Sequence, residues 1–130
     1  MGICLGMQLL AETGTENGHW RGLGWIKGSV SRLSSGESGL RIPHIGWNDV
    51  VPARGDATYS KGFSSPGVFY FVHSYHFVVE ETHLVDGWCK YGTKFAASLA
   101  QNNIWGVQYH PEKSQKAGLQ VLSNYLSQKH

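Results

Sequence analysis

The run Gly2-Ile3-Cys4-Leu5-Gly6, at the start of the chain, restricts the fold more than any other feature of the sequence. It has the Gly-x-Cys-x-Gly pattern of a sharp turn between a strand and a helix, which holds one side chain at its tip. Glycine has no Cβ, so the backbone turns tightly there and another group can approach the tip closely. The pattern predicts that the Cys4 thiol lies at the tip of such a turn.

A second run near the other end of the chain, His110-Pro111-Glu112, supplies an imidazole and a carboxylate. A thiol, a base and an acid that orients the base are the components of an acyl-transfer triad. Cys4 would be the nucleophile, His110 the general base and Glu112 the group that orients the imidazole. The backbone N–H of Leu5 is placed to donate to an oxyanion. Because Pro111 favours a turn, the contact between His110 and Glu112 is a hypothesis at this point.

Each of these residues also has a structural explanation when it is taken alone. A cysteine in an apolar region is commonly a small buried hydrophobe. His110 could be a hydrogen-bonded histidine at a strand end, and Glu112 a first-turn charge that complements a helix dipole. The combination of the turn with the distant His-Pro-Glu run favours chemistry for Cys4. Cys89 lacks such a context, and we expect it in the core.

Length and composition indicate one soluble globular domain over residues 1–130. The chain is 41% hydrophobic and 15% charged, which does not fit a disordered protein. Its net charge of +2 is too small to indicate nucleic-acid binding. The sequence contains no apolar stretch of membrane-spanning length, and its first residues lack the basic region, apolar core and cleavage site of a signal peptide. Two cysteines indicate reduced thiols, so we predict a cytoplasmic protein.

Two helices are predicted, one near each end of the chain. The first covers residues 5–12, with Leu5, Leu9 and Leu10 on its buried side. Gln8 lies one turn beyond Cys4 and can share its face. The second begins after Ser114, a plausible cap, and its apolar residues recur at helical spacing up to position 126.

The remaining apolar runs predict strands. The run 68–72 consists of β-branched and aromatic residues, which predicts a strand buried on both faces. Segments 94–100 and 104–109 flank a turn and are expected to form a hairpin. Further extended segments are predicted over 25–33, 41–51 and 77–79, with a loop over 54–66.

His73 and His76 raise the question of a metal site. Their spacing on an extended segment places them on opposite faces, and no third ligand accompanies them. We therefore predict no metal. His44, beside a proline, is interpreted as structural.

Four segments, in order, resemble the class I (triad) glutamine amidotransferases. Residues 2–8 and 106–114 are similar to the nucleophile and His/Glu segments of that family. Residues 42–48 and 70–75 resemble the glutaminase subunits of imidazole glycerol phosphate synthases. The resemblance implies an α/β fold with a mixed, largely parallel sheet flanked by helices.

The resemblance also implies an activity and a partner. Members of the family hydrolyse glutamine to glutamate and ammonia through a thioester, without a cofactor. In this subfamily the ammonia passes to the (β/α)₈-barrel synthase subunit of histidine biosynthesis. Cys4, His110 and Glu112 would then be the triad. The substrate would be held by Leu5, Gln8, Ser74 and Tyr75.

Three residues are assigned by the resemblance to the synthase interface. Trp47 and Asn48 would face the synthase, where a large aromatic side chain can anchor an interface. Lys113 would lie at the rim of that interface. Ordinary core packing is the alternative explanation for Trp47.

The chain departs from the family pattern at its start, because family members have strands, helices and a glycine loop before the cysteine turn. We expect a C-terminal portion of the domain, from either a fragment or a late-start gene. We also expect low stability and weak glutaminase activity for the chain alone, since losing one oxyanion donor costs on the order of 10²–10³ in turnover.

Three other functions stay open from the sequence. One is a paralogous glutaminase that supplies ammonia to an amidino-sugar synthase of surface polysaccharide. Another is a non-catalytic remnant that binds a synthase, although nothing structural requires all three triad residues together. The last is a hydrolase of γ-glutamyl peptides, which the segment 42–48 argues against.

Overall fold

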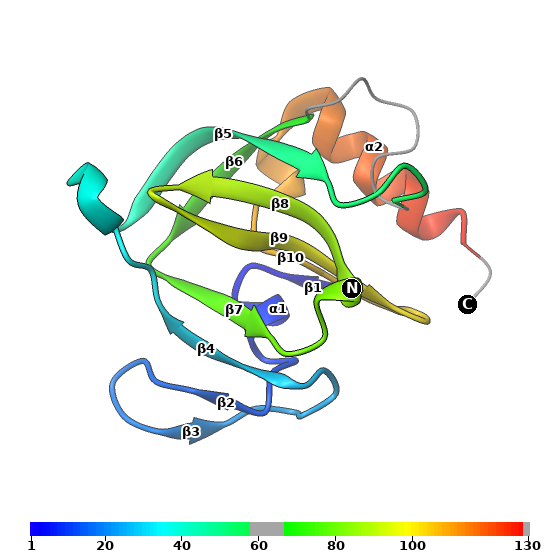
Figure 1. The fold of residues 1–130 in the computed structure, drawn as a ribbon. Helices are drawn as coiled ribbons and strands as arrows, with labels where there is room; N and C mark the ends of the chain where they lie inside the picture. The colour runs from blue at the N-terminus through cyan, green and yellow to red at the C-terminus, as the bar shows by residue number, and fades with distance from the viewer. Residues whose placement is uncertain (58–66, 129–130) are drawn as a thin grey trace.

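The computed structural model describes residues 1–57 and 67–128, which form two sheets, two α-helices and three short 3-10 helices labelled η (Figure 1). The elements in chain order are β1 (Gly2–Ile3), α1 (Leu5–Gln8), β2 (Thr13–Gly14), β3 (Trp20–Arg21), β4 (Gly28–Arg32), η1 (Gly36–Ser38), β5 (His44–Pro52), β6 (Gly67–His73), β7 (Tyr75–Val79), η2 (Thr82–Leu84), β8 (Val85–Tyr91), β9 (Thr93–Gln101), β10 (Ile104–Val107), η3 (Pro111–Lys113) and α2 (Gln115–Leu126). Most of the predicted loop over 54–66 lies outside the described residues. No helix within the described ranges has the length and apolar character needed to cross a membrane.

The six-stranded sheet has the order β1-β10-β9-β8-β5-β6, and the four-stranded sheet has the order β3-β2-β4-β7. Helix α1 lies between the two sheets, and α2 covers the opposite side of the larger sheet (Figure 1). Strand β9 is buried on both sides: Phe95 and Ala97 belong to the core beneath α2, whereas Ala96 belongs to the core that contains α1. The α/β class is as predicted.

The expectation of a largely parallel sheet is wrong for the described strands. The parallel pairings among them are β1 with β10 and β2 with β4. The other pairings are antiparallel, both in the larger sheet from β10 through β9, β8 and β5 to β6 and in the smaller sheet between β2 and β3 and between β4 and β7. Short connections explain the pairings of β8 with β9 and of β9 with β10, because a tight turn can join only antiparallel neighbours, whereas parallel neighbours need a long crossover.

The first helix is shorter than predicted and buries a different face. It ends at Gln8, and the side chains of Leu5 and Leu9 are 61% and 51% exposed. Leu10 is buried as predicted, and Met7 is buried in place of Leu5 and Leu9. Gly106 of β10 explains the choice, because a Cβ there would lie 2.8 Å from Met7 Cγ. Met7 packs into the space above this glycine, and the stripe of the helix that contains Leu5 is exposed to solvent.

Strand β6 confirms the strand predicted over 68–72 but not its burial on both faces. Phe69 and Phe71 are buried, whereas Val68 and Val72 are 45% and 37% exposed. The strand pairs antiparallel with β5, so alternate side chains point to opposite faces and α2 covers one of them.

The hairpin of β9 and β10 and the C-terminal helix are confirmed. Strands β4, β5 and β7 fall within or over the predicted extended segments, and Cys89 is buried as expected. Strand β8 was not predicted; register irregularities between Val85 and Trp88 interrupt its alternation. Ser114 precedes α2, but its side chain makes no capping hydrogen bond.

Gly118 sets the distance between α2 and η3, and we predict that Gly118→Ala destabilises the chain. An added Cβ would lie only 1.8 Å from the carbonyl oxygen of Pro111. Overpacking of this kind costs about 1–3 kcal/mol, which outweighs the gain of about 1 kcal/mol from replacing a helical glycine. Urea unfolding followed by circular dichroism measures the change.

Leu119→Ala is the matched control, because the neighbouring Leu119 side chain is 64% exposed. It should change the free energy of unfolding by no more than about 0.5 kcal/mol. A Gly118→Ala chain as stable as the parent would contradict the tight packing.

Candidate active site

Cys4 occupies the predicted turn between β1 and α1. Its backbone has φ 51° and ψ −106°, a conformation that is costly for a residue with a Cβ. Its N–H donates to the carbonyl of Val107 at 2.8 Å and extends the parallel pairing of β1 with β10. A Cβ on Gly2 would lie 2.5 Å from the carbonyl oxygen of Gly6, so the turn needs glycine there. The predicted position of the thiol is confirmed.

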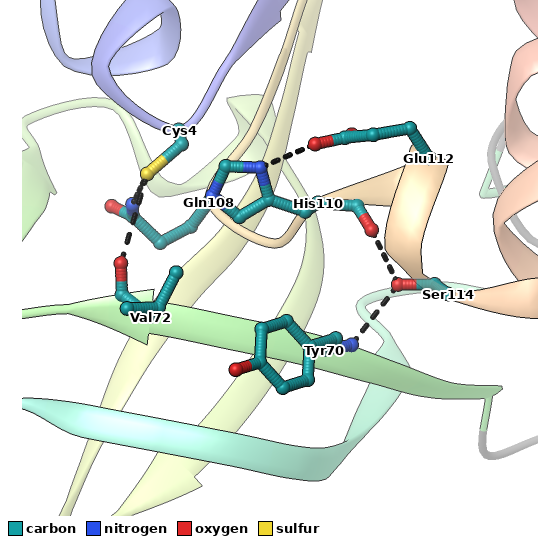
Figure 2. A network of polar contacts seen from close by, with 7 residues as sticks. All are labelled: Cys4, Tyr70, Val72, Gln108, His110, Glu112 and Ser114. Atoms are coloured by element: carbon teal, nitrogen blue, oxygen red, sulfur yellow. Dashed lines mark hydrogen bonds and ion pairs between the residues drawn. The ribbon is translucent and has the colours of Figure 1, made fainter.

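The thiol is partly buried and has two polar neighbours (Figure 2). Its sulfur lies 4.0 Å from the carbonyl oxygen of Val72 and 3.6 Å from Nε2 of Gln108, which donates to it. Burial raises the pKa of Cys4, and the carboxylate of Glu112 raises it further. Hydrogen bonds from the Leu5 N–H and from Gln108 lower this pKa, as does the Lys113 ammonium, but burial has the larger effect. The resting thiol therefore stays protonated and needs a base.

His110 and Glu112 are in direct contact, as hypothesised. Nδ1 of His110 lies 2.6 Å from Oε1 of Glu112 (Figure 2). The 3-10 turn η3 brings the carboxylate back to the ring, with Pro111 in its first position. A carboxylate at Nδ1 fixes the proton on that nitrogen and leaves Nε2 free to accept one. The pair has the geometry of a base with its orienting acid.

Strand β6 places Cys4 and His110 near each other. The Cys4 sulfur is next to the carbonyl of Val72, and the His110 N–H donates to the carbonyl of Tyr70 at 2.9 Å. Two residues along a strand span about 7 Å. Gln108, two positions before His110, donates to the sulfur directly. The two ends of the chain therefore meet over β6.

Two of the residues assigned to the substrate, Gln8 and Tyr75, are hydrogen-bonded to each other near the thiol. Nε2 of Gln8 donates to the carbonyl of Tyr75 at 3.0 Å and to Oε1 of Gln108 at 3.2 Å. Ser74 is half-buried, and its carbonyl accepts from the Leu33 N–H at 2.8 Å. The structure thus brings Gln8 and Tyr75 together, and Gln108 links them to the sulfur.

A cavity of about 390 Å³ opens beside α1. Leu5 and Gln8 line one side, and the opposite side is lined by residues of the β2–β3 region that include Glu16 and Arg21. Three residues of this region were not predicted from the sequence: Glu16, Arg21 and Gln108. Glu16 and Arg21 lie in a glycine-rich stretch without periodicity, so only their opposite charges close behind the cysteine turn could have indicated them.

Trp47 and Lys113 share a surface, but Asn48 does not. Trp47 is 51% exposed and packs edge-on against Tyr70 with ring centroids 5.8 Å apart. Lys113 Nζ lies 5.9 Å from the centroid of the same ring. The core-packing alternative for Trp47 is therefore wrong. Asn48 follows Trp47 on β5 and points to the opposite face, where its amide contacts Nε2 of His44 at 3.2 Å.

The described histidines, cysteines and acids do not gather in groups of three that could hold a metal ion. His44 and His73 contact each other instead, with 2.9 Å between Nδ1 of the first and Nε2 of the second. Both rings are buried.

Solved structures of other proteins share this fold. The chain superposes on PurLQS from Thermotoga maritima with a TM-score of 0.66 at 20% identity, covering 97% of this chain and 59% of that one. A glutamine amidotransferase from the same organism gives a TM-score of 0.63 at 21% identity, covering 96% of this chain and 45% of that one.

Proteins found by sequence comparison are more similar in sequence to this chain than the two solved structures are. An imidazole glycerol phosphate synthase subunit HisH from Moorella thermoacetica is 46% identical over 125 residues, covering 96% of this chain and 58% of the relative. The HisH subunit from Zymomonas mobilis is 44% identical over 126 residues, covering 97% of this chain and 57% of the relative. The HisH subunit from Pelagibacter ubique is 36% identical over 127 residues, covering 98% of this chain and 61% of the relative. The chain thus spans about three fifths of the length of these curated relatives.

The family model for class-I glutamine amidotransferase matches residues 1–128, which is nearly the whole chain. This match agrees with the cysteine turn, with the His-Glu pair and with the fold. The chain belongs to the class I glutamine amidotransferases.

Proposed function

We propose that this chain hydrolyses glutamine to glutamate and ammonia as the glutaminase subunit of an imidazole glycerol phosphate synthase. Cys4 is the nucleophile, His110 the general base and Glu112 the acid that orients it. One arrangement supports this function above all: a strained turn holds the thiol beside the loop that carries the 2.6 Å His110–Glu112 pair. Identity of 36–46% to HisH subunits supports the subfamily.

The reaction follows from the properties of these groups. His110 takes the thiol proton as the Cys4 sulfur attacks the side-chain amide carbon of glutamine, and the Leu5 N–H donates to the oxyanion. The C–N bond then breaks, His110 returns the proton to the leaving nitrogen, and ammonia departs. Water, deprotonated by His110, hydrolyses the thioester to glutamate and restores the thiol. Glu112 stabilises the imidazolium formed in each half-reaction.

The cavity beside α1 suits the amino-acid end of glutamine. A free amino acid presents an ammonium group and a carboxylate, and the cavity lining offers Glu16 and Arg21 to those two charges. Gln8 lines this cavity and also donates to the Tyr75 carbonyl, which follows Ser74 in the chain, so Gln8 connects the cavity to these two residues assigned to the substrate. Leu5 supplies an apolar contact for the methylenes of the substrate.

The proposed partner is a (β/α)₈-barrel synthase subunit in the cytoplasm. It would use the ammonia to form imidazole glycerol phosphate and AICAR in histidine biosynthesis. An exposed aromatic residue beside a cation is the kind of anchor that interfaces use, and Trp47, Tyr70 and Lys113 form one on the side where His110 is held. Asn48 would contribute through the conformation of β5 rather than by direct contact.

Cys4→Ala tests the nucleophile. In the complex with the synthase it should abolish synthesis from glutamine and leave synthesis from added ammonium chloride unchanged, because only the release of ammonia needs the thiol. Cys89→Ala is the control, since Cys89 is buried in the core and should retain both activities. Glutamine-dependent synthesis by the Cys4→Ala complex would refute the assignment.

Glu112→Gln tests the orienting acid. The amide keeps the size of the side chain but removes the charge that stabilises the imidazolium, so kcat for glutamine hydrolysis should fall by roughly 10²–10⁴ with little change in KM. Glu37→Gln changes an exposed acid in η1 and should leave kcat unchanged. Equal kcat values for the Glu112→Gln and parent complexes would exclude the role.

Trp47→Ala tests the partner surface. Loss of an anchoring tryptophan should weaken binding of the synthase partner by a factor of roughly ten or more in titration calorimetry. Trp25→Ala serves as the matched control, because this tryptophan is 57% exposed but lies between β3 and β4, away from β5 and β6. Equal losses of affinity for the two variants would contradict a docking surface at Trp47.

A further inference from the structure

The buried pair of His44 and His73 takes no part in the reaction described above. The two rings are 2% and 7% exposed and lie on the paired strands β5 and β6. Nδ1 of His44 is 2.9 Å from Nε2 of His73. Burial lowers the pKa of each to about 4, so both rings are neutral at neutral pH. Each ring then has one donor and one acceptor nitrogen.

The contacts of the pair determine which nitrogen donates. Nδ1 of His73 is 2.9 Å from the carbonyl oxygen of Tyr75, and a carbonyl can only accept. The proton of His73 is therefore on Nδ1, and its Nε2 accepts from Nδ1 of His44. Nε2 of His44 is left as an acceptor for the amide nitrogen of Asn48, 3.2 Å away.

Asn48 is itself fixed by the backbone. Its amide nitrogen donates to the carbonyl of Lys90 at 3.0 Å, and its amide oxygen accepts from the N–H of Asp49 at 2.8 Å. Neither backbone group can exchange its role. The chain of hydrogen bonds from Asn48 to the Tyr75 carbonyl therefore has a single direction.

The same carbonyl begins a second chain, which ends at the reactive sulfur. The Tyr75 carbonyl oxygen accepts from Nε2 of Gln8. If the Gln8 amide flipped, its Oε1 would face this carbonyl oxygen, and the two acceptors would repel each other. Nε2 of Gln8 also donates to Oε1 of Gln108, which directs Nε2 of Gln108 at the Cys4 sulfur, 3.6 Å away. Gln108 is fully buried, so water does not compete for its amide.

We propose that His73, held by His44, is a positioning residue for the Cys4 sulfur, and that it acts through the Tyr75 carbonyl and the Gln8 and Gln108 amides. Its role in catalysis rests on the proposed function. Without the hydrogen bond from the His73 N–H, the Tyr75 carbonyl can move and no longer fixes the Gln8 amide. The Gln108 amide can then flip and turn its oxygen toward the sulfur. A donor to the thiolate is then replaced by an acceptor that repels it.

The test is the rate of Cys4 alkylation by iodoacetamide as a function of pH. His73→Gln places an amide near Nε2 and loses the donor at the Nδ1 position, so the thiolate loses stabilisation, the thiol pKa rises and alkylation at pH 8 slows about tenfold. His73→Asn places an amide nitrogen near Nδ1, keeps the donor to Tyr75 and should alkylate at the parent rate. Cys89→Ala is used as the background, and the pKa of Cys89 is raised by burial to about 12 in any case.

A purely structural role for His73 predicts a different result. Both variants would then lose thermal stability and alkylate alike, and that outcome overturns the proposal. In the Gln108→Leu background, where the donor to the sulfur is absent, His73→Gln should slow alkylation no further. Additive effects of the two changes would show that His73 does not act through Gln108.

Gln8→Leu replaces His73→Gln if the latter fails to fold. It removes the link between Tyr75 and Gln108 at a half-buried site and should give the same slower alkylation; a parent rate would refute the pathway. Iodoacetamide needs neither glutamine nor the synthase. If the chain alkylates as expected but its complex with the synthase never hydrolyses glutamine, the proposed function is refuted and the positioning role stays intact.

Discussion

The parallel pairing of β1 with β10 is the contact on which the candidate site depends. It involves only Gly2 with Gly106 and Ile3 with Val107. The carboxyl ends of parallel strands meet at the same edge of a sheet, so the residue after Ile3 and the loop after Val107 meet there. Packing of α1 onto β10 supports the pairing, because Gly106 leaves room for Met7. Thiol and imidazole are thus brought together by a few backbone contacts and one glycine.

A second set of contacts fixes the loop that carries the imidazole. The backbone of Tyr70 bonds on both sides: its carbonyl accepts from the His110 N–H, and its own N–H donates to Ser114 Oγ at 3.0 Å. The hydroxyl of Ser114 donates in turn to the carbonyl of His110 at 2.6 Å. This explains why Ser114 makes no helix cap although it stands at the cap position. Its side chain holds the site, and a rigid support of this kind keeps reacting groups aligned.

The sequence predicted those features that depend on local patterns: the cysteine turn, the β9–β10 hairpin, the last helix and the His-Glu run. It failed where a neighbour decides the outcome. The stripes of α1 that contain Leu5 or Met7 are both apolar, and only Gly106 on a distant strand selects the second. Strand β6 has five consecutive apolar or aromatic residues, yet just one of its faces is covered. The link of Gln8 to Gln108 joins positions 100 apart and leaves no periodic signal.

The choice of histidine in the buried network has a physical reason. Lysine or arginine at position 73 would donate to Tyr75 but would bury a cation near the thiol, and an acid could not donate at all once ionised. A neutral imidazole offers a donor and an acceptor on one rigid ring, so it transmits orientation without adding charge. Because burial lowers the pKa of His44 and His73 to about 4, this property persists throughout the neutral pH range. The two buried rings therefore orient the network that reaches the Cys4 sulfur without placing a charge in it.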